Sequence, residues 1–412
     1  MEIRPILATI LRNPVGLILI GLQVALTLAI VVNALYIITT RLDNMRASAG
    51  IDEDNLLTIS STAFSGDESD TLANTRQDLD YLRGLPGVVD AMAVNTLPMA
   101  QSGWSTEIEA SEDPDSHAVP TAIYFADHSL VNSLGLELIA GRPFREAEIK
   151  PYTMDQTLKP DVSIISAALA LALFPDIDNP AQALGRHSWN GDENDRFATE
   201  IVGIVDGIKA PWKGFSVDIF NNVVFVPFIP LYGKTGSYAV RAEPGQLDRL
   251  LGSLQQELTE LNPQRVVRDP RTFSEFRERF FRGDKSMAVM LSVVVGLLLL
   301  VNVLGIVGLV SFWVTQRTKQ IGTRRALGAT RGNILQYFLV ENALISSAGV
   351  LLGAVLAMAL NNWLASEFQV QRLPWHYLAG GSLALLLTGL AATCVPALRA
   401  AAIPPAIATR SV

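Results

Sequence analysis

Four long apolar segments stand out from the rest of the chain, at residues 15–38, 287–314, 334–364 and 377–398. The first contains 24 residues. As a helix it would be roughly 36 Å long, enough to cross a hydrocarbon core of about 30 Å. The pattern therefore predicts four membrane-spanning helices, which leave one long segment between them and four short ones, at 39–286, 1–14, 315–333, 365–376 and 399–412.

The long segment between the first two spans alternates strand-like and helix-like patterns. Runs rich in Val, Ile and aromatic residues predict strands at Leu56–Ser60, Thr121–Phe125, Val162–Ile165, Glu200–Val205, Val223–Ile229, Tyr238–Val240 and Val266–Val267. Helices are expected at Thr75–Leu82 and at Pro244–Leu261, where leucines recur on one face. Strand, helix and strand between 238 and 267 suggest an α/β plait. The predicted fold class is a membrane protein with an α-helical four-span transmembrane domain and a large α+β extracytoplasmic domain inserted between spans 1 and 2.

Charge is distributed unevenly along the chain, and this sets the expected topology. Residues 42–284 contain 20 Lys and Arg against 37 Asp and Glu, whereas the remaining residues contain 12 against 3. Lys and Arg in short loops resist translocation. The basic segment 315–333, the N-terminal segment 1–14 and the tail 399–412 are therefore expected in the cytoplasm. The acidic domain and the short loop 365–376 are expected outside.

The N-terminal segment 1–14 carries apolar residues at helical spacing and is expected to lie on the inner membrane surface as an amphipathic segment. The alternative is a cleaved signal peptide, with Ala47-Ser48-Ala49 as its cleavage site. We favour a retained first span at 15–38, because the apolar run is too long for a signal peptide and charged residues separate it from those alanines.

Residues that would support catalysis or metal binding are sparse. Gly233-Lys234-Thr235 looks like the end of a phosphate-binding loop, but Phe228 stands where that loop needs its first glycine, so we expect a turn. The four histidines show no metal-ligand spacing, and no Gly-x-Ser-x-Gly motif occurs. The single cysteine, Cys394, lies in the last apolar run, so the large domain is expected to fold without a disulfide. We expect no catalytic, metal or cofactor site on this chain, and no nucleic-acid partner, because the soluble part lacks a basic face.

Small and polar residues within the predicted spans suggest helix packing. Gly349 and Gly353 form a Gly-x-x-x-Gly pair in the third span, and Gly305 and Gly308 lie in the second. The alternative for these glycines is helix flexibility. Side-chain amides within the spans are expected to bond to neighbouring helices rather than to line a transport pathway. They belong to Gln23, Asn33 and Asn302.

The basic segment 315–333 also carries a small apolar surface, formed by Ile321, Ala326, Leu327 and Ala329. Gly322 and Gly328 permit turns that would bracket a short helix from Thr323 to Leu327. Such a helix could enter a groove on a soluble partner, with arginines pairing acidic residues at the rim. It could equally be a topogenic loop that binds anionic lipid headgroups. Taken alone, these residues favour neither interpretation.

The same segment resembles the loop after the second span of MacB/FtsX-type ABC permeases. The family pattern is Arg-x-x-Glu-Ile-Gly-x-x-Arg-Ala-Leu-Gly-Ala, and the positions that match it are Arg317, Ile321, Gly322 and the run from Arg325 to Ala329. The family's Phe-Leu-x-Glu motif is matched downstream by Phe338, Leu339 and Glu341. The chain departs from the pattern at Gln320 and Gln316, where the family often has glutamate, and these changes leave the loop uniformly positive.

The long segment is similar to the periplasmic core domain of the MacB-like permeases. The matching stretches are Leu136–Phe144, Val162–Ser166 followed by Leu173–Pro175 and Leu184-Gly185, and Glu200–Asp206. In that family the domain divides into a porter-like part and an inserted second subdomain. No clean linker in this sequence shows where such a division would fall.

In the family, the basic loop forms a short helix that docks on a separate ATPase. The resemblance implies an ATPase-coupling site made of Arg317, Ile321, Gly322, Arg324, Arg325, Ala326, Leu327, Gly328, Ala329 and Arg331. It also adds Glu341 to the residues expected to pack the transmembrane helices, which are otherwise Gly305, Gly308, Gly349 and Gly353.

The resemblance further implies a permease subunit in the bacterial inner membrane, with its large domain in the periplasm. ATP and Mg would be held by the partner ATPase, whose closure would move the permease by mechanotransmission, and the exported cargo would be a peptide, an antibiotic or a similar molecule. Other implied partners are membrane lipid, a second permease chain in a homo- or heterodimer, a periplasmic adaptor and an outer-membrane channel. The alternatives are a permease that extracts lipoproteins or lipid, a non-transporting FtsX-like regulator of a cell-wall hydrolase, and a membrane-anchored sensor.

Two helix-compatible segments, Thr39–Ala49 and Phe273–Phe281, enter and leave the large domain, and we expect them to form a stalk. Phenylalanines recur at helical spacing in the second segment, at Phe273, Phe276, Phe280 and Phe281. They would pack against Leu42, Met45 or a dimer mate. The alternative is that they belong to the core of the large domain.

Overall fold

The computed structural model describes residues 14–113, 116–191, 195–212, 218–268, 270–368 and 372–404. The chain divides into two compact units. One contains Ala47–Arg282 and is called the ectodomain below, and the other, the helical unit, combines Met1–Arg46 with Gly283–Val412. Nearly all of the predicted amphipathic segment and most of the C-terminal tail lie outside the described residues.

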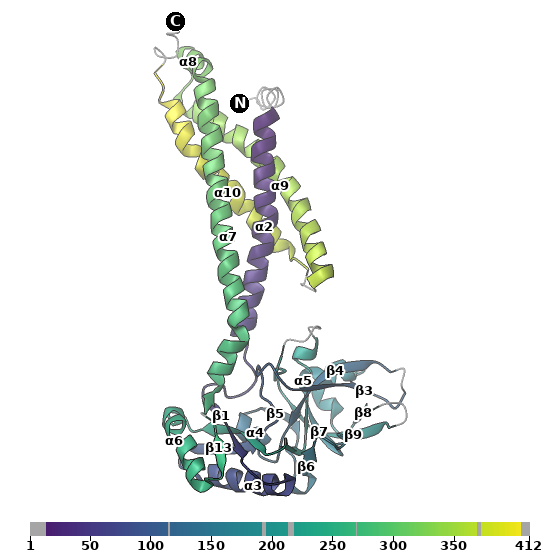
Figure 1. The fold of residues 1–412 in the computed structure, drawn as a ribbon. Helices are drawn as coiled ribbons and strands as arrows, with labels where there is room; N and C mark the ends of the chain where they lie inside the picture. Colours follow the sequence, from purple (N-terminus) through teal and green to yellow (C-terminus); the bar gives the residue numbers. More distant parts are fainter. Residues whose placement is uncertain are drawn as a thin grey trace. The chain divides into compact units, whose positions relative to one another are not determined.

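The described part of the helical unit consists of five helices (Figure 1). They are α2 (Pro14–Arg46), α7 (Phe273–Gln316, of which the residues before Gly283 belong to the ectodomain), α8 (Thr318–Ala326), α9 (Arg331–Phe368) and α10 (Trp375–Ala401). Among the described residues, all of these except α8 are long and apolar enough to cross a membrane. The fold class predicted from the sequence, four spans with a large domain between the first and the second, is confirmed.

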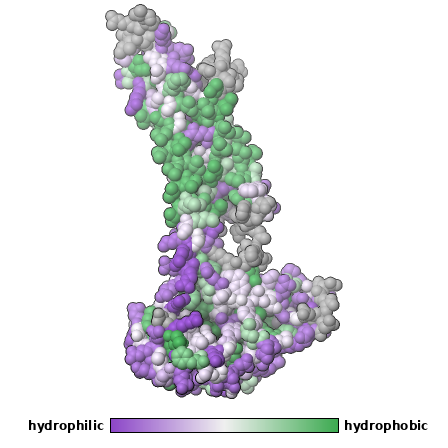
Figure 2. Space-filling view, in the orientation of Figure 1, coloured by the Kyte–Doolittle hydropathy of each residue, from purple (hydrophilic) through white to green (hydrophobic). Residues whose placement is uncertain are grey.

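Hydrophobic side chains cover much of the outer surface of the helical unit (Figure 2). On α7, exposed apolar residues recur along the helix, at Val289, Val293, Leu297, Leu300 and Leu304. Water penalises exposed apolar surface by roughly 25 cal/mol per Å². Lipid or another apolar partner must therefore cover this surface.

Glycines set the closest approach between α9 and α2. A Cβ built on Gly349 would lie 2.7 Å from the Gly21 carbonyl oxygen, and one on Gly353 would lie 2.9 Å from the Ala25 Cα. The two backbones are therefore in direct contact, as small residues in membrane helices permit. In α7 a Cβ on Gly305 would meet the Gln23 side chain at 2.4 Å, whereas no described atom lies within 4 Å of one on Gly308.

Two of the three side-chain amides within the spans bond to a neighbouring helix. Gln23 Nε2 donates to the Val301 carbonyl oxygen over 2.9 Å, and Asn33 Nδ2 donates to the Ala357 carbonyl oxygen over 3.1 Å. Asn302 is fully buried in α7, and within the described part of the chain neither of its amide atoms has a hydrogen-bond partner.

The first ectodomain sheet is an α/β plait. Its strands, in spatial order, are β13 (Arg265–Val267), β1 (Leu56–Ala63), β12 (Thr235–Ala242) and β2 (Val88–Ala93), with β14 (Arg271–Thr272) also paired to β1. Because β1 is antiparallel to both β12 and β13, those two strands are parallel to each other, and α6 (Leu247–Leu261) joins them. Likewise β12 is antiparallel to both β1 and β2, which α3 (Glu68–Gly84) joins. Two interleaved strand-helix-strand units result. The sequence predicted the one that runs through α6, whereas β2 of the other was not predicted.

A capping box sets the start of α3, and the backbone conformation of a glycine sets the start of α6. Asp67 caps α3 by accepting from the Asp70 amide, and the Asp70 side chain accepts from the Asp67 amide in return. α6 begins at Leu247 rather than at the predicted Pro244, because Gly245 has a φ of +82°, which is not helical. Its predicted leucine stripe buries Leu250, Leu254 and Leu258 in the core that it shares with the sheet.

A buried ion pair links α3 to β13 within this plait. Arg265 Nη1 donates to both carboxylate oxygens of Asp78 over 2.6 Å, and the two side chains are 2% and 1% exposed. Arg265 Nη2 and Nε donate to the Leu258 carbonyl oxygen, and Tyr238 Oη donates to Asp78 Oδ2 over 2.7 Å. Burial raises the pKa of Tyr238 above its ordinary value, and nearby Asp78 raises it further, so the phenol remains a donor.

The second sheet closes on itself and is called the barrel below. Its ring runs through β9 (Phe197–Val205), β7 (Val162–Ser166), β10 (Val223–Val226), β4 (Ala118–Phe125), β3 (Trp104–Glu109) and β8 (His187–Asn190). The ring closes because β8 pairs with β9 as well as with β3. β5 (Leu138–Gly141) also pairs with β9. Inward-facing Ile108, Ile123, Ile165, Ile201 and Val224 belong to the core of this subdomain.

The remaining described elements lie between these strands in the chain. β6 (Lys150–Thr153) pairs in parallel with β11 (Phe228–Leu231), and the short helices are α4 (Leu130–Leu134), α5 (Ala167–Leu173), η1 (Glu146–Glu148), η2 (Pro180–Ala183) and η3 (Asp218–Phe220). The strand predicted at 223–229 is divided into β10 and β11 at Pro227, which has no N–H for a ladder. Gly233 has a φ of +63° and lies in the turn between β11 and β12, as expected for a tight turn rather than a phosphate loop.

The barrel is an insertion in the plait. Every strand of the barrel lies between β2 and β12 in the chain, while the strands on either side of it belong to the plait. The boundary that the sequence did not reveal therefore falls after β2 and before β12.

Phe280 stacks on Phe220 with ring centroids 6.0 Å apart, and Phe273 is fully buried. These two phenylalanines therefore belong to the ectodomain core. This agrees with the alternative interpretation of the segment Phe273–Phe281, in which its phenylalanines pack inside the large domain.

Candidate functional site

The basic segment folds as a nine-residue helix, α8, whose limits differ from those expected. It runs from Thr318 to Ala326, so Gly322 lies inside the helix instead of in a turn before it. At the other end Gly328 has a φ of +99°, and the Ala329 amide donates to the Arg324 carbonyl oxygen. A left-handed glycine of this kind is a common helix stop. One of the two predicted turns is therefore present.

One side of α8 packs into the helical unit. Ile321 is 5% exposed and joins the hydrophobic core that contains Ile334 and Phe338. Gly322 is also buried, and Ala329 packs against the same core. Much of the apolar surface that the sequence offered to a partner is thus used within the chain.

Arg317, at the start of α8, forms an ion pair with Glu341 on α9 in which one guanidinium nitrogen reaches both carboxylate oxygens. Its Nη1 lies 2.8 Å from Glu341 Oε1 and 2.9 Å from Oε2, and the two side chains are 17% and 3% exposed. The guanidinium carbon lies 6.0 Å from the Trp313 ring centroid. The carboxylate compensates one charge of the basic segment, so the folded segment is not uniformly positive.

Arg325 fixes the other end of α8. Its Nη1 donates to the carbonyl oxygens of Ala401, over 3.1 Å, and Ile403, over 2.5 Å, where α10 ends. Ala401 is the last residue of α10 and Ile403 follows it closely. The last carbonyl groups of a helix lack donors within the helix, so an arginine satisfies them well. Arg325 therefore positions α8 on α10 within the chain.

The outward side of α8 remains available to a partner. Leu327 is 83% exposed, and Arg324, Ala326, Gly328 and Arg331 are also exposed. The Arg324 guanidinium carbon lies 4.8 Å from the centroid of the Tyr337 ring, which restricts where its charge can lie. We call these five exposed residues the outer α8 surface. A large exposed leucine between cationic side chains suits an apolar groove with an acidic rim.

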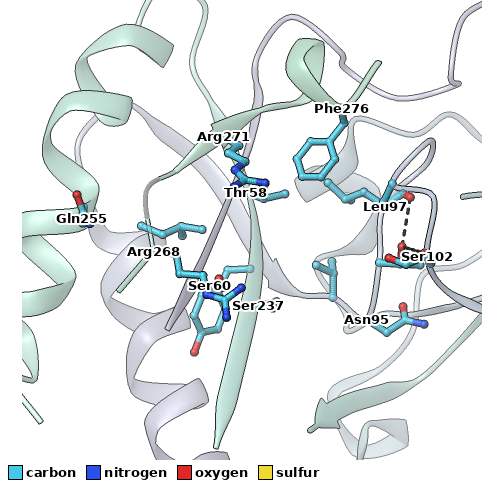
Figure 3. A pocket seen from close by; sticks show the side chains of 15 residues that line it. Thr58, Ser60, Asn95, Leu97, Ser102, Ser237, Gln255, Arg268, Arg271 and Phe276 are labelled. Carbon is cyan, nitrogen blue, oxygen red and sulfur yellow. Dashed lines mark hydrogen bonds between the residues drawn. The ribbon is translucent and has the colours of Figure 1, made fainter. Parts of the chain in front are cut away.

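The ectodomain contains a cleft of about 640 Å³ on the plait (Figure 3). Hydroxyl groups of Thr58, Ser60 and Ser237 line it from strands β1 and β12, next to the guanidinium groups of Arg268 and Arg271. Phe276 and Leu97 add apolar surface. The described lining residues include two arginines and no carboxylate, which is unusual in a domain so rich in acidic residues.

The loop that forms one wall of this cleft has a strained backbone. Met99 and Gln101 have φ values of 61° and 64°, a region that residues other than glycine adopt rarely. Both are held in place, because the Met99 amide donates to the Ala210 carbonyl oxygen and the Gln101 amide donates to that of Pro211. Strain held in this way is often found at functional sites. No sequence pattern indicated this loop, since neither residue is glycine.

Family models match both units of the chain. The MacB-like periplasmic core domain matches residues 16–257, and the FtsX-like permease C-terminal domain matches residues 292–405. The chain belongs to the MacB-like family of ABC transporter permeases. The second match contains α8, so the helix described above lies within the permease's family-defining C-terminal region.

Two relatives illustrate how far the likeness of this permease extends. YknZ of Bacillus subtilis (strain 168), an uncharacterized ABC transporter permease, is 26% identical over 350 residues, which cover 82% of this chain and 79% of YknZ. The macrolide export ATP-binding/permease protein MacB of Marinobacter nauticus is 28% identical over 298 residues, covering 69% of this chain and 44% of that MacB. The permease therefore spans about four fifths of YknZ but less than half of MacB.

Among solved structures, the extracellular domain of YknZ aligns with 51% of this permease at 17% sequence identity, with a TM-score of 0.31, and is itself covered to 99%. At that score the likeness carries no argument about fold or function.

Proposed function

We propose that this chain is the permease subunit of a MacB-like ABC transporter that is driven by a separate ATPase chain. The outer α8 surface carries this proposal. One face of α8 is fixed by Ile321, Arg317 and Arg325, while the opposite side presents an exposed leucine and cationic residues. A short helix held rigidly from behind is suited to transmit a displacement applied at its exposed side.

The connection from α8 to the ectodomain supports mechanotransmission. α7 ends at Gln316 and α8 begins at Thr318, so little flexible chain separates them. α7 is one unbroken helix from Phe273, which belongs to the ectodomain, to Gln316, and an α-helix transmits force better than a flexible linker. ATP-driven movement of α8 would therefore reach the ectodomain through α7. ATP and Mg would bind to the partner ATPase.

The exposed apolar side of α7 supports a second permease chain as a further partner. The exposed side chains include Val293, Leu297 and Leu304. In a dimer the helices of the second permease chain would cover part of this apolar surface, and lipid would cover the rest. We place the basic α8 segment and both chain ends in the cytoplasm and the acidic ectodomain in the periplasm, following the positive-inside rule. The membrane would then be the bacterial inner membrane.

Cargo of the peptide or antibiotic class would meet the transporter at the ectodomain. The cleft on the plait has a volume typical of ligand sites, and its two arginines suit an anionic group. The strained loop beside it, with Met99 and Gln101, is the cleft's second distinguishing feature. Movement transmitted by α7 would act on the plait, because β14 and α7 are adjacent in the chain.

The test is a Leu327→Asp variant in the complete chain. A buried leucine contributes roughly 1.5–3 kcal/mol at an interface, so association with the ATPase that co-purifies with the wild-type permease should fall at least tenfold. The chain should still insert, because the side chain is 83% exposed. Leu327→Met should retain binding.

Leu184→Asp is the matched control, since Leu184 is 41% exposed and lies in the ectodomain. It should leave ATPase association unchanged. If Leu327→Asp also leaves association unchanged in correctly inserted protein, the outer α8 surface is not the docking site and the coupling proposal fails.

A further inference from the structure

The cleft on the plait has a floor of hydroxyl groups. In β1, Leu57 and Ile59 belong to the core that the sheet shares with α6. Side chains alternate between the two faces of a strand, so Thr58 and Ser60 lie on the face away from that core. Ser237 of β12 is directly opposite Ser60 and shares this face. All three hydroxyl-bearing side chains line the cleft (Figure 3).

A ligand in the cleft can reach these hydroxyl groups. The side chains of Thr58, Ser60 and Ser237 are half-buried, and within the described part of the chain their oxygens form no hydrogen bond. None of the three oxygens is among the fully buried polar atoms that lack a partner, so each retains accessible surface. An accessible hydroxyl group bonds to water until a ligand with its own donor or acceptor displaces that water.

Two arginines lie on the side of β1 away from β12. Arg271 of β14 is opposite Thr58, and the Arg268 amide donates to the Ser60 carbonyl oxygen over 2.8 Å. Both side chains are exposed, and neither forms an ion pair or a hydrogen bond with the described residues. Asp269 stands between them in the chain, outside the described residues, and one carboxylate can compensate at most one of the two charges. The cleft therefore carries excess positive charge.

This positive charge lies in an acidic domain. Residues 42–284 contain 37 Asp and Glu against 20 Lys and Arg, and many arginines of the ectodomain pair with these carboxylates. The paired ones are Arg83, Arg142, Arg186, Arg196, Arg241, Arg265 and Arg277. Arg268 and Arg271 differ from them in being unpaired and in sharing one cleft. A cleft lined by charge of one sign focuses the electric field and concentrates ions of the opposite sign, so these arginines direct an anion to it.

The charge of the domain favours a carboxylate over a phosphate as that anion. The surplus of acidic residues repels every negative charge that a ligand brings. A carboxylate brings one, whereas a phosphate ester brings about 1.5 to 2 at pH 7. The two oxygens of a carboxylate also match the paired N–H groups of a guanidinium. A monoanion with two oxygens is therefore the group that the two arginines suit best.

The rest of the cleft is preformed. Both amide atoms of Asn95 bond to backbone groups of β4, and Thr96 Oγ1 donates to the Ser102 carbonyl oxygen. These bonds hold one wall in place before a ligand arrives, which lowers the entropic cost of binding. Phe276 of α7 is half-buried and gives the cleft an apolar side.

We propose that this cleft binds a small amphipathic acid, a molecule with a carboxylate, a neighbouring amide and an apolar group, of which an acylated amino acid is the type. The carboxylate would lie against Arg268 and Arg271, the amide against the hydroxyl groups of Ser60 and Ser237, and the apolar group against Phe276. A volume of about 640 Å³ accommodates such a molecule. This inference rests on the proposed function only where it takes the acid as cargo, because binding itself needs no ATPase.

The probe is N-acetyl-4-fluoro-L-phenylalanine, which carries a carboxylate, an amide and an aromatic ring. Its fluorine signal is titrated with the full-length permease in lipid nanodiscs, without an ATPase, and empty nanodiscs correct for partition into lipid. We expect saturable binding, which Arg268→Gln and Arg271→Gln should each weaken by roughly tenfold, the value of a charge-assisted hydrogen bond. Ser237→Ala should weaken it by roughly two- to tenfold, the value of a neutral one. The primary amide of the probe, which lacks the charge, should bind equally weakly to the wild type and to the arginine variants.

Arg76→Gln is the matched control. Arg76 is an exposed arginine of α3 that has no ion pair in the described part of the chain and does not line the cleft, so the variant removes the same charge from the same domain. It should bind the probe like the wild type, and unchanged thermal midpoints will show that all these variants are folded.

Several results would overturn the proposal. They are the absence of saturable binding to the wild type, equal binding of the acid and its primary amide, and an effect of Arg76→Gln as large as that of the cleft variants. Tighter binding of 4-fluorophenyl phosphate than of the acid would overturn the assignment to a carboxylate. Because the assay contains no ATPase, a failure here leaves the coupling proposal standing, and a failure of coupling leaves this one standing.

Discussion

The ion pair between Arg317 and Glu341 offers the sharpest test of how α8 is held. Glu341→Gln and Arg317→Met each remove one charge and leave the other in a largely desolvated position. Removing one member of a buried pair typically costs about 3–5 kcal/mol, and we take about 3 because Arg317 is 17% exposed. α8 should then detach from α9 more often, although the four spans should stay folded.

Hydrogen exchange of α8 amides measures this detachment directly. The Ile321 amide donates to the Arg317 carbonyl oxygen within the helix, so its exchange reports opening of α8. A loss of about 3 kcal/mol corresponds to an exchange rate more than 100-fold faster, since each 1.4 kcal/mol is a factor of ten. Mass spectrometry of the permease in nanodiscs can resolve a change of that size.

The double variant Arg317→Met, Glu341→Met distinguishes two effects. One is the loss of the ion pair itself, and the other is the cost of leaving one of its charges unpaired. Replacing both charges with apolar groups leaves no charge unpaired, so α8 should recover most of its protection. Arg331→Met is the matched control, because that arginine is exposed at the start of α9 and should change nothing. Less than a tenfold effect in Glu341→Gln, or a double variant as labile as the two single effects combined, would refute the reasoning.

Two further predictions concern packing and pH. Gly353→Val should force α9 away from α2, because its Cβ would lie 2.9 Å from the Ala25 Cα, and overpacking of this kind costs about 1–3 kcal/mol. The thermal midpoint of the purified permease should therefore fall, whereas Gly308→Val should leave it unchanged. Equal effects of the two variants would contradict the packing described. Hydrogen bonds from Arg142 lower the pKa of Glu148 below its ordinary value of 4.5, so the stability that they provide is present above that pH and is lost as the pH falls through the lowered pKa. Arg142→Gln should therefore lower the urea midpoint of ectodomain unfolding at pH 7, by an amount that shrinks below about pH 4.5, and a difference independent of pH would contradict the assignment.

The sequence predicted those features that local patterns encode. Apolar runs long enough to span a bilayer gave the four transmembrane helices, and the leucine repeat in α6 gave the face that this helix buries. Strands β10, which is entirely apolar, and β7, in which Val and Ile fill three of the five positions, were also found. β3 and β8 were missed because the barrel exposes one face, so their sequences are short and partly polar.

Pairings between distant residues could not be predicted in this way. Arg265 and Asp78 are 187 residues apart and Arg317 and Glu341 are 24 apart, and in neither case does the local sequence identify the partner. The sequence thus assigned Arg317 to a partner protein, while the fold provides an internal carboxylate. Closure of the barrel was equally hidden, because the pairing of β3 with β8 joins residues that are far apart in the chain, with Glu109 opposite Trp189.

The insertion of the barrel between β2 and β12 also has a consequence for how the ectodomain assembles. β1 must pair with β12 across a long excursion of the chain, with Leu57 opposite Val240. Such non-local pairing is slow, because the entropy of closing the loop has to be lost before the contacts form. β3 and β4, and β8 and β9, are neighbours in the chain and can pair early. We therefore expect the barrel to fold before the plait and to shorten the loop that the plait must close. Until then β1 and β2 have unpaired edges, so any variant that delays the barrel exposes the newly synthesised domain to aggregation.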